Sequence, residues 1–234
     1  MKVDIWSDVR CPFCYIGKRK FEKALTQFPQ RDKVEVEWHS FELDPGMKTD
    51  TTINVFDYLA QRKKISRESS VQLHEQVREM AKNVGLEYNF DRSVIANSFD
   101  AHRFIQFAKQ YKLGDAAEER LFRAYFTEGK DISDHLTLIV LGNEIGLDGR
   151  LVKQMLDSDG FADEVRYDEK QAVEMGINGV PYFVINNRYG VSGAQPTETF
   201  LRALKKGWED FEEDNVVAFA NQTDKNSCAP NTDC

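Results

Sequence analysis

The spacing of apolar residues changes twice along the chain, and each change predicts a different kind of secondary structure. Residues 2–7 form a short apolar run that predicts a buried strand, and residues from about 12 to 27 have the spacing of an amphipathic helix that ends before Pro29. Residues 34–41 alternate with period two up to the turn signal at residues 44–46, which predicts a half-buried strand. The chain therefore begins with a predicted β-α-β unit.

From about residue 52 to 176 the spacing is helical, with start signals alternating with glycine stop signals. The start signals are Thr51, Ser66, Ser93 and Asp148, and the stop signals are Gly85, Gly114, Gly146 and Gly176. One predicted helix runs from Ser93 to Lys112. Another runs from Ser133 to Gly146, where the apolar residues predict a buried helix; they are Leu136, Leu138, Ile139, Val140 and Leu141.

Strand spacing returns at Ile177. Two short apolar runs, 181–185 and 189–193, flank Asn186-Asn187-Arg188 and predict a β-hairpin. A helix is predicted from Pro196 to about Gly207. The residues that follow are acidic and then polar, which predicts a mobile tail.

These patterns divide the chain into three parts. Residues 1–50 and 177–207 form a discontinuous α/β domain, residues 51–176 form a helical insertion domain, and residues 208–234 form the tail. The 234 residues, 41% of them hydrophobic, suffice for a sizeable core. With the insertion removed, the order β-α-β followed by β-β-α is that of the thioredoxin fold.

A C-x-x-C pair, Cys11-Pro12-Phe13-Cys14, lies between the first strand and the first helix. Only a thiolate attacks a disulfide, and the unpaired N–H groups of a helix's first turn stabilise negative charge. Pro12 fits the first helical position, where its missing N–H costs no hydrogen bond. We therefore expect Cys11 to be the nucleophile and Cys14 the buried resolving thiol.

The same four letters also fit half of a zinc site or a structural disulfide. The other cysteines, Cys228 and Cys234, are spaced C-x5-C and lie more than 200 residues away, which disfavours a four-cysteine zinc site. We expect no metal ion and no organic cofactor.

Charge and composition narrow the possible partners and the cellular location of the protein. A net charge of −8 argues against nucleic-acid binding, which needs a basic surface. Residues 1–8 lack the apolar core of a secretory signal, and no apolar run reaches the length of a membrane span. We therefore expect a cytoplasmic protein without a membrane partner, in which paired cysteines are catalytic or redox-sensing.

A backbone edge beside the dithiol is needed to hold an incoming cysteine. Gly179-Val180-Pro181, at the start of the third strand, is the candidate, and we expect a cis peptide bond between Val180 and Pro181.

Four separated segments carry a family resemblance: residues 7–17, 41–45, 97–103 and 176–183. Together they resemble the FrnE-like branch of the DsbA family, over roughly residues 1–207. The resemblance implies a thioredoxin fold with an inserted helical domain and thiol-disulfide oxidoreductase activity. It also implies that Cys11 and Cys14 are the redox pair and that Pro181 is the cis proline beside them.

The same superfamily includes 2-hydroxychromene-2-carboxylate isomerases and kappa-class glutathione transferases. A serine generally occupies their position matching Cys11, so the cysteine here departs from the isomerase pattern. Glutathione remains a candidate reductant.

The resemblance adds candidates around the thiols. Asn97 and His102 match a segment that faces the thiols from the insertion, where a histidine could stabilise the Cys11 thiolate, although a packed or surface histidine is the alternative. The candidate substrate-binding residues are Pro12, Phe13, Val180, Asn97 and His102. Asp8 and Glu37 are candidates for relaying the Cys14 proton, with solvated side chains as the alternative.

Cys228 and Cys234 have three interpretations: an auxiliary redox pair, a small tail disulfide, or incidental thiols. A flexible tail of about 20 residues spans on the order of 25 Å, so it could reach the active site. A tethered dithiol would also act at high effective concentration.

The sequence thus predicts a thiol-disulfide oxidoreductase acting on a protein or small molecule that carries a thiol or a disulfide. A glutathione-dependent isomerase or transferase and a zinc-binding module are the alternatives. The direction of electron flow depends on the reduction potential of the Cys11–Cys14 pair relative to that of its surroundings.

Overall fold

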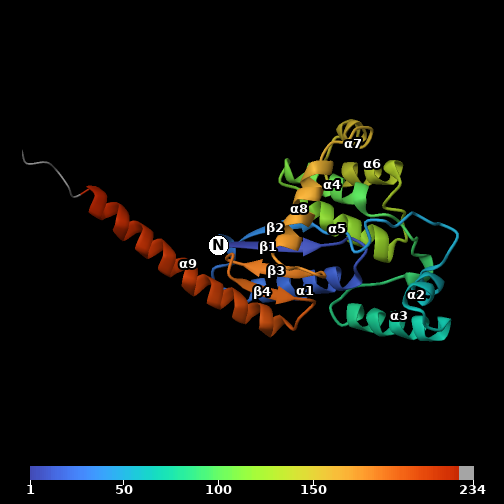
Figure 1. Cartoon of the computed structure of the whole chain (residues 1–234), viewed down its shortest axis with the longest axis horizontal. Coiled ribbons are helices and arrows are strands. Elements are labelled where there is room, and N and C mark those ends of the chain that lie inside the picture. Colours follow the sequence, from blue (N-terminus) through green and yellow to red (C-terminus); the bar gives the residue numbers. More distant parts are fainter. Residues whose placement is uncertain (227–234) are drawn as a thin grey trace, which may run out of the picture.

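The centre of the molecule is a mixed four-stranded sheet with the strand order β2-β1-β3-β4. The computed structural model describes the backbone of residues 1–226 and the side chains of residues 1–214. Strand β1 (Lys2–Ser7) pairs in parallel with β2 (Glu35–Ser40) and antiparallel with β3 (Tyr182–Ile185), which pairs antiparallel with β4 (Tyr189–Ser192). The predicted strands and hairpin are confirmed (Figure 1).

Each face of the sheet is covered by helices. Helices α1 (Pro12–Thr26) and α9 (Thr197–Asn226) pack together against one face, where Phe21, Phe183 and Phe200 are buried in the same cluster. Helix α8 (Ala162–Glu174) covers the other face, where Ala172 and Ile177 pack with Trp6 and Val184. Alternate residues of β1 thus enter opposite cores, as period-two side-chain direction requires.

The insertion contributes seven α-helices. They are α2 (Val55–Lys63), α3 (Arg67–Lys82), α4 (Phe99–Lys109), α5 (Gly114–Phe122), α6 (His135–Glu144), α7 (Gly149–Leu156) and α8. Figure 1 shows α2 and α3 beyond one end of the strands and the other five on the side of β2, which α5 and α8 contact. Short 3₁₀ helices span Arg31–Lys33 and Phe90–Arg92, and a π-helical turn spans Arg123–Thr127. The apolar cluster of the insertion includes both thiols of the C-x-x-C pair. The dithiol therefore lies where the insertion meets the sheet domain.

The predicted helix from Ser93 to Lys112 is wrong at its start. Helix α4 begins at Phe99, because the preceding segment is extended and the Asp50 amide donates to the Ile95 carbonyl at 2.8 Å. Ser93 instead ends the 3₁₀ helix Phe90–Arg92.

The prediction that Gly114 stops a helix is wrong, because Gly114 is the first residue of α5. Lys112 adopts the left-handed conformation that separates α4 from α5, with φ of 60°. The start signal at Thr51 is also displaced, since the Asn54 side chain caps α2 by accepting from the Asp57 amide at 2.9 Å.

Helix α6 is buried on one side, not on all sides as its apolar run predicts. Leu138 and Leu141 are fully buried, whereas Leu136 is 71% and Val140 51% exposed. Residues four apart share one helical face, and here the face that carries Leu136 and Val140 is turned toward solvent.

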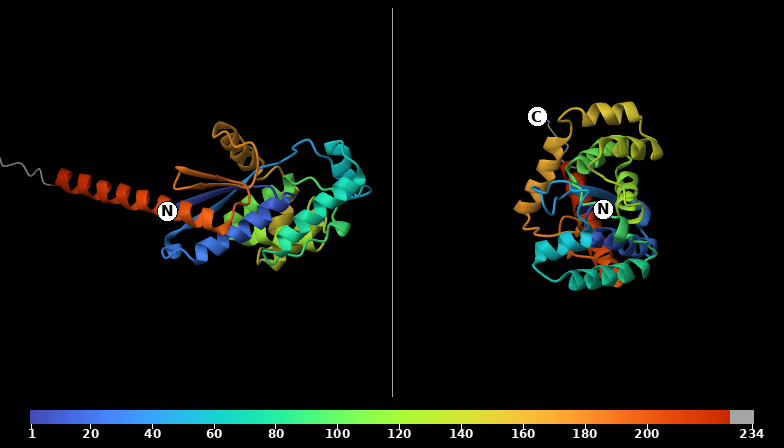
Figure 2. Two further views of the ribbon diagram at one scale, coloured as in Figure 1. Left: turned by 90° about the horizontal axis from the view of Figure 1, so that it is seen from below. Right: turned by 90° about the vertical axis from the view of Figure 1, so that its right-hand side faces the viewer.

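The predicted boundary at Gly207 is also wrong, because α9 continues through it to Asn226. Trp208 packs edge-on against Phe28, with ring centroids 6.0 Å apart, and Asp210 accepts a 2.6 Å hydrogen bond from the Tyr189 hydroxyl. The ribbon of α9 projects from the body at the end opposite α2 and α3 (Figures 1 and 2). Cys228 and Cys234 lie outside the described residues. Within residues 1–226, none of the helices combines the length and apolar composition needed to cross a membrane.

Candidate active site

The two thiols lie at the first turn of α1. Cys11 is the N-cap residue and Pro12 occupies the first helical position. The Cys11 amide donates to the Asp8 carbonyl at 2.8 Å, and the Cys14 amide donates to the Cys11 carbonyl at 3.0 Å. Both cysteines are free thiols, with Cys11 4% exposed and Cys14 fully buried. The order of exposure fits an attacking thiol followed by a resolving thiol.

The predicted cis bond between Val180 and Pro181 is confirmed. The Cys11 thiol lies 3.5 Å from the Val180 carbonyl oxygen, to which it donates, although the two residues are 169 positions apart. Gly17 makes this approach possible, because a Cβ atom there would lie 2.9 Å from Pro181 Cγ. The turn before β3 is therefore held against α1, directly beside the dithiol.

Burial raises the pKa of the Cys14 thiol well above its ordinary value, and the adjacent Cys11 thiol raises it further. The Asp8 backbone and the Ser7 hydroxyl act against this rise and lower the pKa. Cys14 is consequently protonated at neutral pH and must lose a proton before it can attack.

Beneath the thiols, Ser7 on β1 and Glu118 on α5 form a buried pair. The Ser7 hydroxyl donates to Glu118 Oε1 at 2.6 Å, and each residue is 1% exposed. Burial raises the pKa of Glu118 to about 7, against the opposing hydrogen bond from Ser7. The sequence pattern singled out neither residue as part of the site. A serine at the end of an apolar strand was a weak signal for Ser7, and nothing in the pattern of α5 distinguished Glu118.

A second buried pair joins α4 to the segment before the motif. His102 Nε2 lies 3.7 Å from Asp8 Oδ1, and the Asp8 carboxylate also accepts from the amides of Arg10 and Leu43. Burial acts to raise the pKa of Asp8, but His102 holds it below its ordinary value. Burial acts to lower the pKa of His102, but Asp8 holds it above its ordinary value. Asp8 is fully buried, so the alternative of a solvated Asp8 side chain is wrong.

The roles predicted for His102 and Asn97 at the thiols stay predictions. No hydrogen bond joins His102 to Cys11 or Cys14 within the described part of the chain, and its ring is buried. The Asn97 side chain accepts from the Phe99 amide at 2.8 Å and donates to the Met47 carbonyl at 2.9 Å, which fixes the entry to α4.

Glu37 is engaged at the sheet surface, where it accepts from Lys2 at 2.6 Å and pairs with Lys109 at 3.0 Å. With Asp4 and His39 it forms the one group of three potential metal-ligating side chains found among the described residues. That group contains no thiol, and Lys2 already pairs with both of its carboxylates.

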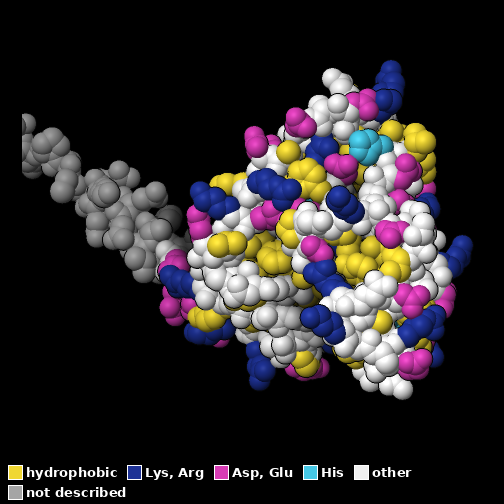
Figure 3. Space-filling view, turned by 45° about the vertical axis from the view of Figure 1, so that its right-hand side comes forward, with side chains coloured by type: hydrophobic (Ala, Val, Ile, Leu, Met, Phe, Trp, Pro, Cys, Tyr) yellow, Lys and Arg dark blue, Asp and Glu magenta, His cyan; other side chains and the backbone are white. Residues whose placement is uncertain are grey.

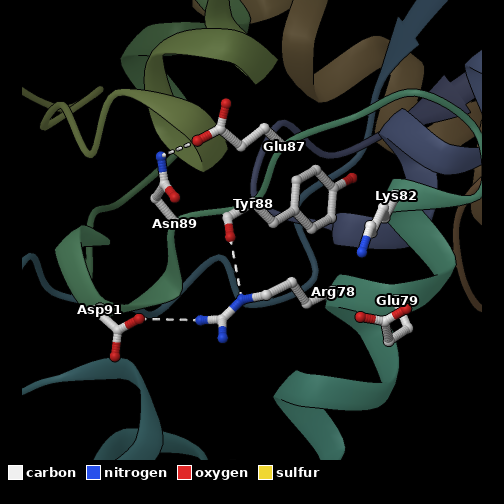
Figure 4. A pocket seen from close by; sticks show the side chains of 7 residues that line it. All are labelled: Arg78, Glu79, Lys82, Glu87, Tyr88, Asn89 and Asp91. Carbon is white, nitrogen blue, oxygen red and sulfur yellow. Dashed lines mark hydrogen bonds and ion pairs between the residues drawn. The ribbon is translucent and has the colours of Figure 1, made fainter.

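Tyr88, which the sequence did not single out, connects the motif to a polar pocket. Its hydroxyl donates to the Pro12 carbonyl at 2.7 Å. The pocket on its other side encloses about 380 Å³, and Arg78 there donates to the Tyr88 carbonyl and pairs with Asp91 (Figure 4). The remaining lining residues are Glu79, Lys82, Glu87 and Asn89. The pocket thus offers charges of both signs close to the motif.

Comparisons with known proteins identify relatives over most of the chain. The family model of the DSBA-like thioredoxin domain matches residues 2–205. A probable DsbA oxidoreductase from Streptomyces coelicolor is 40% identical, with a TM-score of 0.85 over 89% of this chain and 90% of its own. The uncharacterized protein YwbO of Bacillus subtilis (strain 168) is 33% identical over 205 residues, 86% of this chain and 94% of that protein.

A cytosolic disulfide reductase, DsbM from Pseudomonas aeruginosa, shares the fold at 17% identity, with a TM-score of 0.61 over 93% of this chain and 100% of its own. That protein has also been solved with GSH. The family match spans most of the chain, and both relatives above 30% identity are covered nearly in full. The chain therefore belongs to the DsbA-like thioredoxin domain family of oxidoreductases.

Proposed function

We propose that the protein is a thiol-disulfide oxidoreductase of the FrnE-like branch, with Cys11 and Cys14 as its redox pair. The observation that supports this best is the position of the Cys11 thiol. It lies at the N-terminus of α1 and 3.5 Å from the Val180 carbonyl, beside the cis proline Pro181. A thiol at this position combines a stabilised negative charge with a backbone edge for an incoming chain.

The reaction consists of two exchanges. In the reduced protein, the Cys11 thiolate attacks a substrate disulfide, one substrate sulfur leaves as a thiolate, and a mixed disulfide forms. Cys14 then attacks the Cys11 sulfur, the second substrate thiolate leaves, and the Cys11–Cys14 disulfide forms. In the oxidised protein the same steps run in reverse, so a substrate dithiol is oxidised while the pair is reduced.

Substrate binding would use the surface around the motif. Phe13 is 38% and Leu43 45% exposed, which is high for large apolar side chains. Figure 3 shows hydrophobic side chains gathered across the middle of one face, between Lys and Arg side chains. Pro12, Phe13 and Val180 are the proposed contacts for a disulfide-containing protein or peptide.

Glutathione is the proposed small-molecule partner. The pocket beside Tyr88 has charges of both signs, which suits a thiol that carries an ammonium group and two carboxylates. The Pseudomonas reductase solved with GSH supports this choice, and its cytosolic location supports a cytoplasmic setting.

Separate serine substitutions of the two cysteines test the proposal. We expect Cys11→Ser to abolish disulfide reduction, and Cys14→Ser to accumulate a mixed disulfide with the substrate because no thiol resolves it. Mass spectrometry of the acid-quenched protein measures both. Tight glutathione binding and turnover with an unchanged thiol count would instead support the glutathione-dependent isomerase or transferase, and stoichiometric zinc in the purified protein would support the zinc module.

The auxiliary role of Cys228 and Cys234 needs its own test, since both lie outside the described residues. If they exchange with the active-site pair, replacing both by serine slows reduction of the Cys11–Cys14 disulfide. Unchanged reduction kinetics and turnover would rule out that role.

A further inference from the structure

Cys14 needs a proton acceptor, and neither candidate from the sequence is placed to serve. The Asp8 carboxylate accepts from two backbone amides and lies beside His102, and Glu37 is paired with Lys2 and Lys109. The groups that act on the pKa of the Cys14 thiol are instead the Cys11 thiol, the Asp8 backbone and the Ser7 hydroxyl, the last of which lowers it. Of these three, the Ser7 hydroxyl donates a 2.6 Å hydrogen bond to a buried carboxylate, that of Glu118.

We propose that Glu118 accepts the proton of Cys14 through the Ser7 hydroxyl when Cys14 resolves the mixed disulfide, and returns it in the reverse reaction. This inference rests on the proposed thiol-disulfide exchange. It assigns to the insertion a catalytic task, because Glu118 belongs to α5 and lies 111 residues from Ser7 in the chain.

The proton transfer balances without an external base. The Cys14 S–H proton passes to the Ser7 oxygen while the Ser7 O–H proton passes to the Glu118 carboxylate. Ser7 is unchanged, Glu118 becomes a carboxylic acid, and the Cys14 thiolate attacks the Cys11 sulfur as the substrate thiolate leaves. The 2.6 Å hydrogen bond already points from Ser7 to Glu118, which is the direction that this transfer requires.

The surroundings tune Glu118 for this task. Burial raises its pKa to about 7, close to the pH at which an acid-base group works best in both directions. Charges from three elements act on it: His102 on α4 and Lys18 on α1 lower its pKa, and Asp115 on α5 raises it. The Cys14 thiol is faced by Cys11 and by Tyr88. Burial raises the pKa of Tyr88 well above its ordinary value.

A two-phase thiol release assay separates the relay from the first chemical step. The full chain, with Cys228 and Cys234 replaced by serine, is reduced and mixed with excess dithionitrobenzoate. Attack by Cys11 releases the first aromatic thiolate at a rate that scales with reagent concentration. Attack by Cys14 releases the second at a rate that does not.

We expect Glu118→Gln and Ser7→Ala to slow the second phase by about tenfold or more while the first phase stays within about twofold. In the parent protein of this assay, with only Cys228 and Cys234 replaced, the second phase should accelerate with an inflection near pH 7, where Glu118 ionises, and Glu118→Gln should remove that inflection. Ser7→Thr, which keeps a hydroxyl, should restore much of the rate.

Glu119→Gln is the matched control, because Glu119 is the adjacent carboxylate on α5 and pairs with Arg19 and Tyr15 instead of Ser7. It should leave the inflection in place. A second phase that keeps its rate and inflection in Glu118→Gln would overturn the relay, and so would equal slowing of both phases. Absence of the first phase in the parent protein of this assay would instead refute thiol-disulfide exchange itself.

Discussion

At Gly17 a hydrogen atom stands where any other residue has a side chain, and the Pro181 ring lies directly over it. The helix residue and the proline are far apart in the chain, yet their contact lies directly beside the 3.5 Å approach of the Cys11 thiol to the Val180 carbonyl oxygen. The pyrrolidine ring is rigid, so an added methyl group would have to push two backbone segments apart.

We therefore expect Gly17→Ala to lower the free energy of unfolding by about 1 to 3 kcal/mol, the range typical of overpacking. It should also slow the attack of Cys11 on a disulfide, because the substrate edge at Val180 moves. Urea unfolding and stopped-flow kinetics measure the two effects. Gly46→Ala serves as the control, since its nearest neighbour would lie 3.9 Å away; equal effects of both variants would contradict the argument.

At the scale of elements, α9 shows how packing extends a helix past a composition boundary. Gly207 allows α9 to approach β3 closely, since a Cβ atom there would lie 2.6 Å from Ile185 Cγ2. Trp208 follows at once and is buried against Phe28. The acidic residues that predict a mobile tail begin one residue later, on a helix already anchored to the sheet.

Replacement of Trp208 by alanine tests this anchoring. Removal of a buried tryptophan costs about 3 to 5 kcal/mol, so the midpoint of urea unfolding should fall markedly. Lys205→Ala, at an exposed position of the same helix, should leave the midpoint nearly unchanged. If Trp208→Ala left the midpoint of urea unfolding unchanged, α9 would not be anchored beyond Gly207.

At the scale of the whole molecule, the insertion completes the site. The Glu118, His102 and Tyr88 side chains reach the sheet domain from three different segments of the insertion, and each contacts the strand end or helix start that holds the thiols. This arrangement places ionisable groups in the apolar interior, where pH affects folding as well as catalysis.

Glu118 should make stability depend on pH. Its pKa is raised from 4.5 to about 7 in the folded protein, so the folded form holds its proton where the unfolded form has lost it. The contribution of Glu118 to the free energy of unfolding is fully present below about pH 4.5. It is lost as the pH rises through 7, a decline of about 3 kcal/mol in total. Urea unfolding of the reduced protein at pH 5 and pH 8 should show that decline, and Glu118→Gln should show a smaller one. An identical pH dependence in the variant would contradict the assignment.

Much of the fold followed from local patterns. Strand and helix periods, the turn signal at residues 44–46 and the hairpin at residues 186–188 depend on side-chain direction and backbone preference within a few residues, so the sequence revealed them directly. The position of Cys11 at a helix start is local in the same sense. The cis bond at Pro181 was predicted from element order, which is also readable along the chain.

The tertiary structure alone decided which side chains meet. A period shows that a helix has an apolar face, but not which face another helix covers, and so Val140 is exposed although its run predicted burial. Helix limits likewise depended on distant contacts, as at Phe99 and Trp208. The Ser7–Glu118 pair depends on packing between segments 111 residues apart, and no local preference encodes such a meeting. The sequence by itself determined the dithiol and the order of strands and helices around it. The packing of the insertion decided which buried ionisable groups lie beside the thiols.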